Sequence, residues 1–140
     1  MPVETPNQAY TANLEKWTKS RDAVNGSDAV KAKGVKYLPM LDSQSQQEYE
    51  AYINRALYFG ASGRTVQGLL GAVFRKDYEL EYPERYKEEH TTLFTPDGLT
   101  FRDYAMQSVD EVITIGRVGC LVDVYAEGDT RAYATLYSAE

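Results

Sequence analysis

The sequence is poor in the residues from which most active sites are built. It contains one cysteine, Cys120, and one histidine, His90, among 140 residues. A single histidine excludes a metal site with two histidine ligands, and a single cysteine excludes an internal disulfide. The chain has no GxSxG motif and nothing in the sequence that would orient His90, so Ser-His-Asp hydrolysis is not expected. His90 follows Glu88 and Glu89 in a charged segment, which is typical of a solvated surface and not of a metal site.

Long hydrophobic runs are also missing. The longest one, Gly68 to Phe74, is far shorter than the ~20 residues that cross a bilayer. The first residues, MPVETP, lack the basic start and apolar core of a signal peptide. We therefore expect no membrane association and a protein that stays in the cytosol. In that setting Cys120, within the apolar run CLVDVY, is predicted to be a buried strand thiol and not a reactive one.

Basic residues are scarce in the second half of the chain. Residues 1–75 carry nine Lys or Arg against seven Asp or Glu, whereas residues 76–140 carry six against fourteen. Tight wrapping of nucleic acid depends on Lys and Arg displacing counterions from phosphates, so the acidic half argues against it. Carboxylates are plentiful, but the sequence singles out no pair of them. We expect no catalytic residue, no metal and no cofactor, and a carboxylate enzyme is the least favoured alternative.

Helical periodicity dominates the first sixty residues. A first helix ends at Asn25-Gly26, and a short second helix runs from Ser27, its predicted N-cap, to Gly34. Ser45 and Glu48 have the spacing of a capping box, which predicts a third helix from Gln46. The predicted apolar faces are Tyr10, Leu14, Trp17, Arg21 and Val24 on the first helix, and Tyr49, Tyr52, Ile53, Ala56, Leu57 and Phe59 on the third.

The stretch GASGRTVQGLLGAVFRK, residues 60–76, suggests a phosphate-binding loop at first sight. The glycines of GASGRT are two residues too close for that motif, arginine replaces its lysine, and a helix precedes it instead of a strand. The stretch instead predicts a helix with Val66, Leu69, Leu70 and Val73 on a buried face. On its other side we single out Arg64, Gly68, Gly71 and Arg75 as a candidate packing surface against another helix or subunit; a merely exposed glycine pair remains the alternative.

The second half of the chain mixes strand and helix patterns. The alternation of Tyr78, Leu80 and Tyr82 predicts a strand with one acidic face, and TPDGLT predicts a turn. A helix capped by Thr100 and ended by Gly116 should follow. Its predicted buried face is Phe101, Ala105, Val109, Val112 and Ile113. Two strands, about 120–125 and 131–137, then form a hairpin.

These elements predict an α+β fold, with a mainly helical N-terminal portion followed by a small antiparallel β pair. The length of 140 residues suits one domain, or a fragment of a larger one.

Several stretches together resemble the N-terminal part of a tailed-phage portal-like family, long catalogued as a domain of unknown function. The matching stretches are AVKAKGVKYLPML, EYEAYINRALYFGASGRTVQGLLGAVFRK, FRDYAMQSVDEVITIGRVGCLVDVY and the strand RAYATLYSAE. The resemblance runs from about Val3 to the last residue. Its most specific part is a helix rich in Tyr, Arg and Ala that leads into GRTVxGLLGxVFRK.

The resemblance implies a structural role in the virion, in the wing region of a ring, usually of twelve subunits, at one capsid vertex. DNA would pass through the ring without sequence-specific binding during packaging and ejection. The partners implied for a complete portal are copies of itself, the terminase, the capsid and head-completion proteins, with no ATP hydrolysis by the portal. The location implied is the virion, or the host cytoplasm during assembly.

Family members run to several hundred residues and continue past the strand that matches RAYATLYSAE. We therefore expect a fragment or a truncated product, with its final strand as an exposed edge. The alternative function, from another class, is a small stand-alone protein-binding domain that uses its tyrosines as contacts, because tyrosine is enriched at interfaces.

Overall fold

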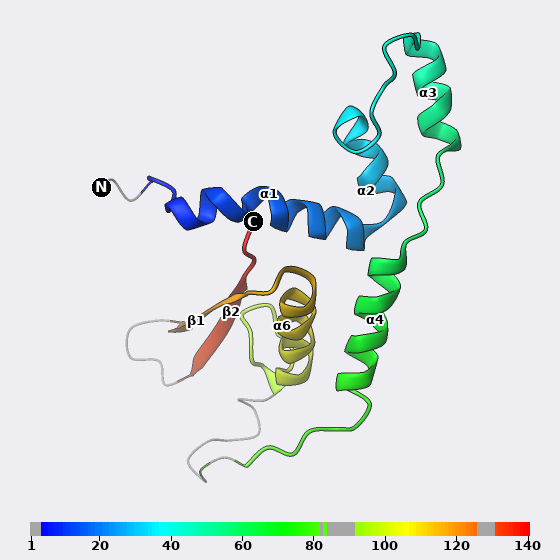
Figure 1. Ribbon diagram of the computed structural model, residues 1–140. Coiled ribbons are helices and arrows are strands. Elements are labelled where there is room, and N and C mark those ends of the chain that lie inside the picture. Colours follow the sequence, from blue (N-terminus) through cyan, green and yellow to red (C-terminus); the bar gives the residue numbers. More distant parts are fainter. Residues whose placement is uncertain (1–3, 82, 84–91, 126–130) are drawn as a thin grey trace. The chain divides into compact units, whose positions relative to one another are not determined.

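The computed structural model describes residues 4–81, 83, 92–125 and 131–140 (Figure 1). These residues are mainly helical and include a small two-stranded antiparallel sheet, which confirms the predicted α+β class. They fall into two compact units, Met1–Gln67 and Gly68–Glu140. His90 and the charged segment around it, predicted to be a solvated surface, lie outside the described residues.

The first unit is built from short helices whose ends follow local signals. It contains α1 (Gln8–Asn25), α2 (Ser27–Ala32), a 3-10 turn (Gly34–Lys36), α3 (Gln46–Arg55) and the start of α4 (Ala61–Val73). The Asn7 side chain accepts from the Ala9 N–H and begins α1, and Gly26 ends it with a φ of 91°. Ser27, predicted to be an N-cap, is instead the first residue of α2.

The predicted capping box of α3 is present. The Glu48 N–H donates to Ser45 Oγ at 3.3 Å, and the Ser45 N–H donates to Glu48 Oε2 at 2.8 Å. The bond from the Ser45 N–H and, less strongly, a second one from the Ser45 hydroxyl to Glu48 Oε2 lower the pKa of the Glu48 carboxyl, because they stabilise its charged form. The predicted extension of this apolar face to Phe59 is wrong, since α3 ends at Arg55 and Leu57 and Phe59 are 99% and 75% exposed.

Two tyrosine hydroxyls join the segments of the first unit. Tyr49 is buried, and its hydroxyl donates to the Leu38 carbonyl at 2.8 Å. Tyr58 lies in the segment after α3, and its hydroxyl donates to the Ala23 carbonyl, near the end of α1, at 2.8 Å. These bonds attach the α3 region to the turn before it and to α1.

The second unit pairs one helix with the sheet. It contains α6 (Phe101–Ile115), β1 (Gly119–Val124) and β2 (Ala132–Tyr137). As predicted, the Thr100 side chain accepts from the Asp103 N–H at the start of α6, and Gly116, with a φ of 90°, ends it. β1 and β2 are antiparallel, with a register from Gly119↔Tyr137 to Val124↔Ala132, which confirms the predicted strand pair.

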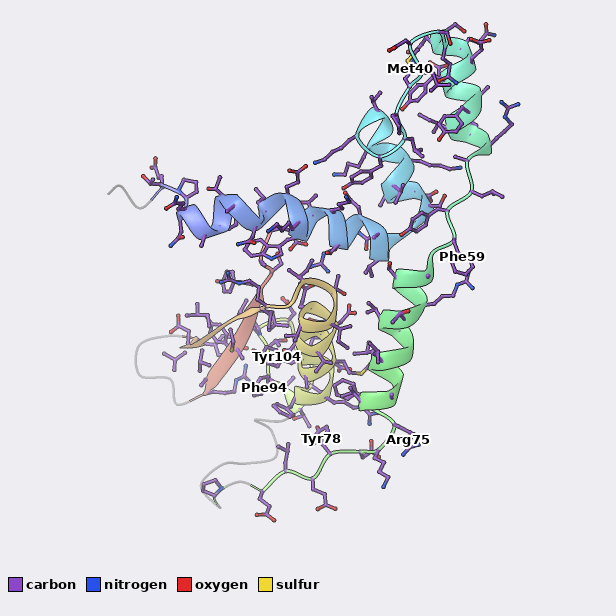
Figure 2. The ribbon with its side chains drawn as sticks, in the orientation of Figure 1. Met40, Phe59, Arg75, Tyr78, Phe94 and Tyr104 are labelled. Atoms are coloured by element: carbon purple, nitrogen blue, oxygen red, sulfur yellow. The ribbon has the colours of Figure 1, made fainter. Side chains whose placement is uncertain are left out.

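An aromatic cluster forms the core of the second unit. Phe94 lies between Phe101 and Tyr104, with ring centroids 5.1 and 4.9 Å away, and Tyr78 packs on Phe101 at 5.4 Å (Figure 2). Ala134 of β2 is 2% exposed, and its N–H donates to the Phe94 carbonyl at 3.0 Å. The Phe94 segment therefore covers the side of β2 that faces away from β1.

The turn predicted from TPDGLT follows Phe94. Gly98 adopts a φ of 81°, and its N–H donates to the Thr95 carbonyl at 3.1 Å. Thr95 is only 6% exposed, and its hydroxyl oxygen accepts from the Leu99 N–H at 3.0 Å. The turn is therefore closed by a buried side chain.

Two predictions for this unit are wrong. Residues 77–81 form no strand ladder, and Tyr82 lies outside the described residues. Tyr78 instead joins the aromatic cluster, while Asp77 pairs with Arg102. On α6 the buried residues are Tyr104 and Thr114, whereas Val112, predicted to be buried, is 48% exposed. The two buried residues lie on a different side of α6 from the one that its apolar periodicity indicates, where Phe101, Ala105, Val109 and Ile113 are half-buried.

Thr95→Val should lower the free energy of unfolding by about 1–2 kcal/mol, because it leaves the Leu99 N–H without its buried acceptor. Urea unfolding followed by circular dichroism measures the change. The control is Thr65→Val on α4, an exposed site where the same change should have little effect. Equal stabilities of the two variants would contradict the role of Thr95.

Candidate functional site

The glycine face of α4, formed by Gly68 and Gly71, is the predicted packing surface that remains open. Among the described residues, a Cβ built on either glycine would have no atom within 4 Å, apart from the helix itself. At 100° per residue, Val66 and Leu70 lie on the opposite side of α4. Val66 is 5% exposed and Leu70 is half-buried, so that side is the covered one. Another backbone could approach the bare side closely, because no side chain stands in its way.

The predicted buried side of α4 is only partly right. Leu69 and Val73, which were expected to be buried with Val66 and Leu70, are 49% and 57% exposed. They lie next to the covered side and turn away from the glycine face. α4 therefore carries exposed apolar side chains in addition to its bare glycines.

The two arginines predicted to flank the glycine face have different positions. Arg64 lies in α4, where its Nη2 donates to the Phe59 carbonyl at 2.9 Å and its guanidinium stands 5.0 Å from the Phe59 ring centroid. Arg75 lies beyond α4, in the turn that follows Val73 (Figure 2). Arg64 therefore lies on α4 on the same side as the glycines, as predicted, and only Arg75 lies outside the helix.

A third glycine, which the sequence patterns did not single out as a packing position, makes a close approach within the first unit. A Cβ on Gly63 would stand 2.7 Å from the Val24 carbonyl oxygen of α1, a distance that real side chains do not reach. Gly63 lies inside α4, while Gly60, with a φ of 63°, precedes the first turn. Gly63 is therefore the glycine that α4 needs for packing within the chain.

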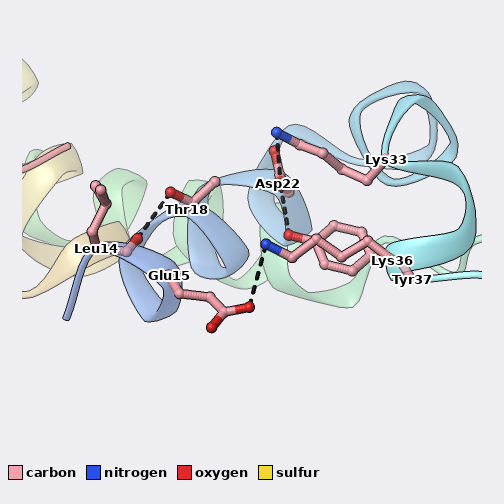
Figure 3. A network of polar contacts seen from close by, with 7 residues as sticks. All are labelled: Leu14, Glu15, Thr18, Asp22, Lys33, Lys36 and Tyr37. Carbon is pink, nitrogen blue, oxygen red and sulfur yellow. Dashed lines mark hydrogen bonds and ion pairs between the residues drawn. The ribbon is translucent and has the colours of Figure 1, made fainter. Parts of the chain in front are cut away.

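A buried carboxylate that the sequence patterns also missed lies at the centre of a polar cluster in the first unit (Figure 3). Asp22 of α1 is 7% exposed, the Tyr37 hydroxyl donates to its Oδ2 at 2.6 Å, and Lys33 Nζ lies 3.6 Å from the same oxygen. Beside it, Lys36 pairs with Glu15 at 3.3 Å. Asp22 lies about 100° around α1 from Arg21, outside the predicted apolar face, so the periodicity gave no signal for it.

The Tyr37 hydroxyl stays protonated in this cluster. Its hydrogen bond to Asp22, partial burial and the negative charges of Asp22 and Glu15 raise the pKa of Tyr37 to about 12. A cavity of about 290 Å³ lies nearby, lined by Lys19, Ala23, Val30, Lys36, Tyr37 and Tyr58. The cluster positions the end of α1 against the turn that carries Tyr37.

A second tyrosine binds the single cysteine. The Tyr104 hydroxyl donates to Cys120 Sγ at 2.7 Å. The pKa of Tyr104 is raised to about 12, mainly because the hydroxyl is partly buried and secondly because of this bond. Cys120 lies in β1 as predicted, but the prediction that it is buried is wrong, because the residue is exposed. The thiol attaches β1 to α6 through the tyrosine hydroxyl.

Residues that could bind a metal are not brought together in the described part of the chain. Among the residues the structure describes, no three His, Cys, Asp or Glu side chains converge as a metal site requires. Within the same residues no helix has both the length and the apolar character of a membrane span. No protein-family model matches the chain, and no curated protein matches its sequence.

Gly63→Ala and Gly68→Ala should have opposite effects on stability. Gly63→Ala should lower the free energy of unfolding by about 1–3 kcal/mol, because its methyl group would overlap the Val24 carbonyl. Gly68→Ala should raise it by about 0.5–1 kcal/mol, since it improves helix propensity in open space. Urea unfolding of both variants measures the difference. A destabilised Gly68→Ala chain would contradict the open glycine face.

The Tyr37 hydroxyl should ionise at a higher pH than the hydroxyl of an exposed tyrosine. Its pKa, about 12 in the folded state, lies above the unfolded value of about 10. The bond to Asp22 therefore stabilises the fold fully below about pH 10 and is lost between about pH 10 and 12. Tyrosinate absorbance of the wild type minus that of Tyr37→Phe measures the titration. Asp22→Asn should move it to lower pH; an unchanged curve would contradict the assignment.

Proposed function

We propose that this chain is a structural assembly module, the N-terminal, wing-like region of a phage portal-like protein that forms a ring at the capsid vertex. The observation that carries the proposal is the glycine face of α4, which is bare, helical and without a neighbour among the residues that the structure describes. It lies within GRTVxGLLGxVFRK, the most specific part of the portal resemblance. Glycines cost helix stability, so a second backbone packed on them gives a physical reason for their presence.

The thin core supports a role in assembly. Among the described residues, no large side chain is less than 2% exposed. Many apolar side chains stand at the surface, where contact with another subunit would remove them from water. Those at least 45% exposed are Val35, Leu41, Leu57, Phe59, Leu69, Val73, Val112, Leu121, Val122, Val124 and Tyr137.

The charge distribution agrees with a passage for DNA in the proposed ring. Residues 76–140 carry fourteen acidic against six basic side chains. A surface of this sign repels a polyanion and would let it slide, whereas sequence-specific or tight binding needs a basic surface. In the complete protein we propose copies of itself, the terminase, the capsid and head-completion proteins as partners. The module would act by packing, without a cofactor and without catalysis.

The tyrosines give some support to the alternative, a stand-alone binding domain. Tyr10, Tyr52, Tyr78, Tyr125 and Tyr137 are 37–55% exposed. Several of them are engaged in ring contacts within the chain, such as Tyr10 with Trp17 and Tyr125 with Tyr133. The exposed apolar side chains are spread along both units instead of surrounding these tyrosines, so the portal-like module is the better supported function.

Gly68→Leu should abolish ring formation while the fold remains intact, because the new side chain occupies open space in the chain but blocks a backbone neighbour. Multi-angle light scattering and electron microscopy of concentrated protein measure assembly. The matched control is Ala51→Leu, an exposed position on α3, which should assemble as the wild type does.

Two results would count against the portal-like module. A Gly68→Leu chain that forms the same rings as the wild type would return the glycine face to a merely exposed surface. A wild-type chain that stays a compact monomer and binds a partner through its tyrosines would favour the stand-alone domain. Genes for a large terminase subunit and a major capsid protein should also neighbour its gene.

A further inference from the structure

The free edge of β1, formed by the outward backbone groups of Cys120, Val122 and Val124, is open in the described part of the chain. β1 pairs with β2 on one side only, and all six of its residues are exposed. The final strand was predicted to be the exposed edge, but β2 is the better covered strand, since the Phe94 segment bonds to it through Ala134. The unpaired edge therefore belongs to β1.

The backbone direction along this edge follows from two hydrogen bonds. The Ala134 N–H donates to Phe94 and so points away from β1. Its partner across the sheet, Val122, must therefore point its own N–H and C=O away from β2, because opposite residues of an antiparallel pair share one orientation. Backbone groups of successive strand residues point to alternate sides, so the N–H and C=O of Cys120 and Val124 also point away from β2. The Val124 N–H agrees with this, since it donates to Asp123 Oδ1 at 2.8 Å.

The side chains at the edge are suited to another strand. Val122 is 66% exposed, and Leu121 and Val124 are 46% and 45% exposed. Cys120 points toward α6, where it meets Tyr104, so Val122 and Val124 lie on that face of the sheet and Leu121 and Asp123 on the other. Asp123 is the one charged side chain within β1.

We propose that the β1 edge binds the β1 edge of a second copy of this chain, antiparallel and centred on Cys120. Backbone hydrogen bonds would then join Cys120 to the partner's Cys120 and Val122 to the partner's Val118. On the other face, each Arg117, which precedes β1 and already has an interaction within its own chain, would turn to the partner's Asp123. Each Leu121 would lie over the partner's Gly119, which has no side chain to obstruct it. The result is a continuous four-stranded sheet, β2-β1-β1-β2.

Charge selects this register over the neighbouring ones. A pairing centred on Val122 would place Asp123 opposite an apolar Leu121, and a pairing centred on Asp123 would place two carboxylates opposite each other, which is unfavourable. The register centred on Cys120 instead gives two opposite-charge pairs. It also ends before Val124, whose N–H already has the Asp123 side chain as its acceptor. No existing bond of Val124 has to break.

This contact is independent of the proposed ring. Pairing of two β1 edges is isologous and closes at two copies, whereas a ring requires two different surfaces that meet head to tail. The glycine face of α4 would serve the ring, and the β1 edge would serve the two-fold contact. A variant of one surface should leave the other contact unchanged.

Charge reversal on the full chain tests the proposal. Arg117→Asp and Asp123→Arg should each weaken the dimer by about tenfold or more, because each places two like-charge pairs in the contact. The double variant should dimerise as the wild type does. An equimolar mixture of the two single variants should form a heterodimer, since every pair is then opposite in charge. Native mass spectrometry and sedimentation velocity measure these masses.

Cysteine cross-linking tests the register. In a Cys120→Ala background, Val118→Cys and Val122→Cys chains mixed under mild oxidation should form a disulfide-linked heterodimer, because directly opposite Cα atoms lie about 5.5 Å apart. Val122→Cys alone should not cross-link to itself. Val122→Pro should abolish the dimer yet leave the β1–β2 ladder intact, since the lost N–H points away from β2.

Three results would overturn the proposal. They are a two-fold contact that survives both single charge reversals, efficient self-cross-linking of Val122→Cys, and a dimer that persists in Val122→Pro. A wild-type chain with no two-fold contact at high concentration would also overturn it, whatever the ring experiment with Gly68→Leu shows.

Discussion

Hydrogen bonds from tyrosine hydroxyls to distant segments are the interactions on which both units depend. Each of these tyrosines supplies a large apolar ring to a thin core and ends in a donor that reaches a turn, a helix end or a strand. The partners lie 11 to 35 residues away along the chain, so each bond closes a long segment that short-range signals would leave loose. The bonds run from Tyr37 to Asp22, Tyr49 to Leu38, Tyr58 to Ala23, Tyr104 to Cys120 and Tyr125 to Thr95. This role accounts for five of the twelve tyrosines in the sequence.

Features that depend on neighbouring residues alone could be predicted from the sequence, and features that depend on distant contacts could not. The capping box of α3, the Thr100 cap of α6 and the glycine at its end all lie within a few residues of the bonds they make. Burial was predicted less well, because it depends on which side of a helix another element covers. On α4 the covered side includes Val66 but leaves Leu69 exposed, although both fit one periodic stripe. The packing role of Gly63 could not be predicted for the same reason, since its close contact is with Val24, a distant residue in the sequence.

The bonds that replace a large core also explain why so much apolar surface is left. A directional bond fixes a segment at one point, whereas a core of side chains would have covered whole faces of the helices. α3 is attached mainly through Tyr49, and the segment after it through Tyr58, so Leu57, between the two, is fully exposed. The chain can therefore hold its local geometry while it keeps apolar faces available. This combination suits a module whose remaining surface is buried by other subunits.

The two open surfaces, the glycine face of α4 and the β1 edge, differ in what determines which partner can bind them. The glycine face of α4 has no side chain at its centre, so its specificity must come from groups beside it, such as the exposed Arg64, one turn before Gly68. The β1 edge offers backbone groups, which would pair with any extended strand if nothing restricted them. Asp123 supplies that restriction, because its carboxylate occupies the outward Val124 N–H and disfavours a strand that lacks a basic residue opposite. One acidic side chain thus shortens the usable edge and also defines its register, so an open strand edge need not lead to indiscriminate aggregation.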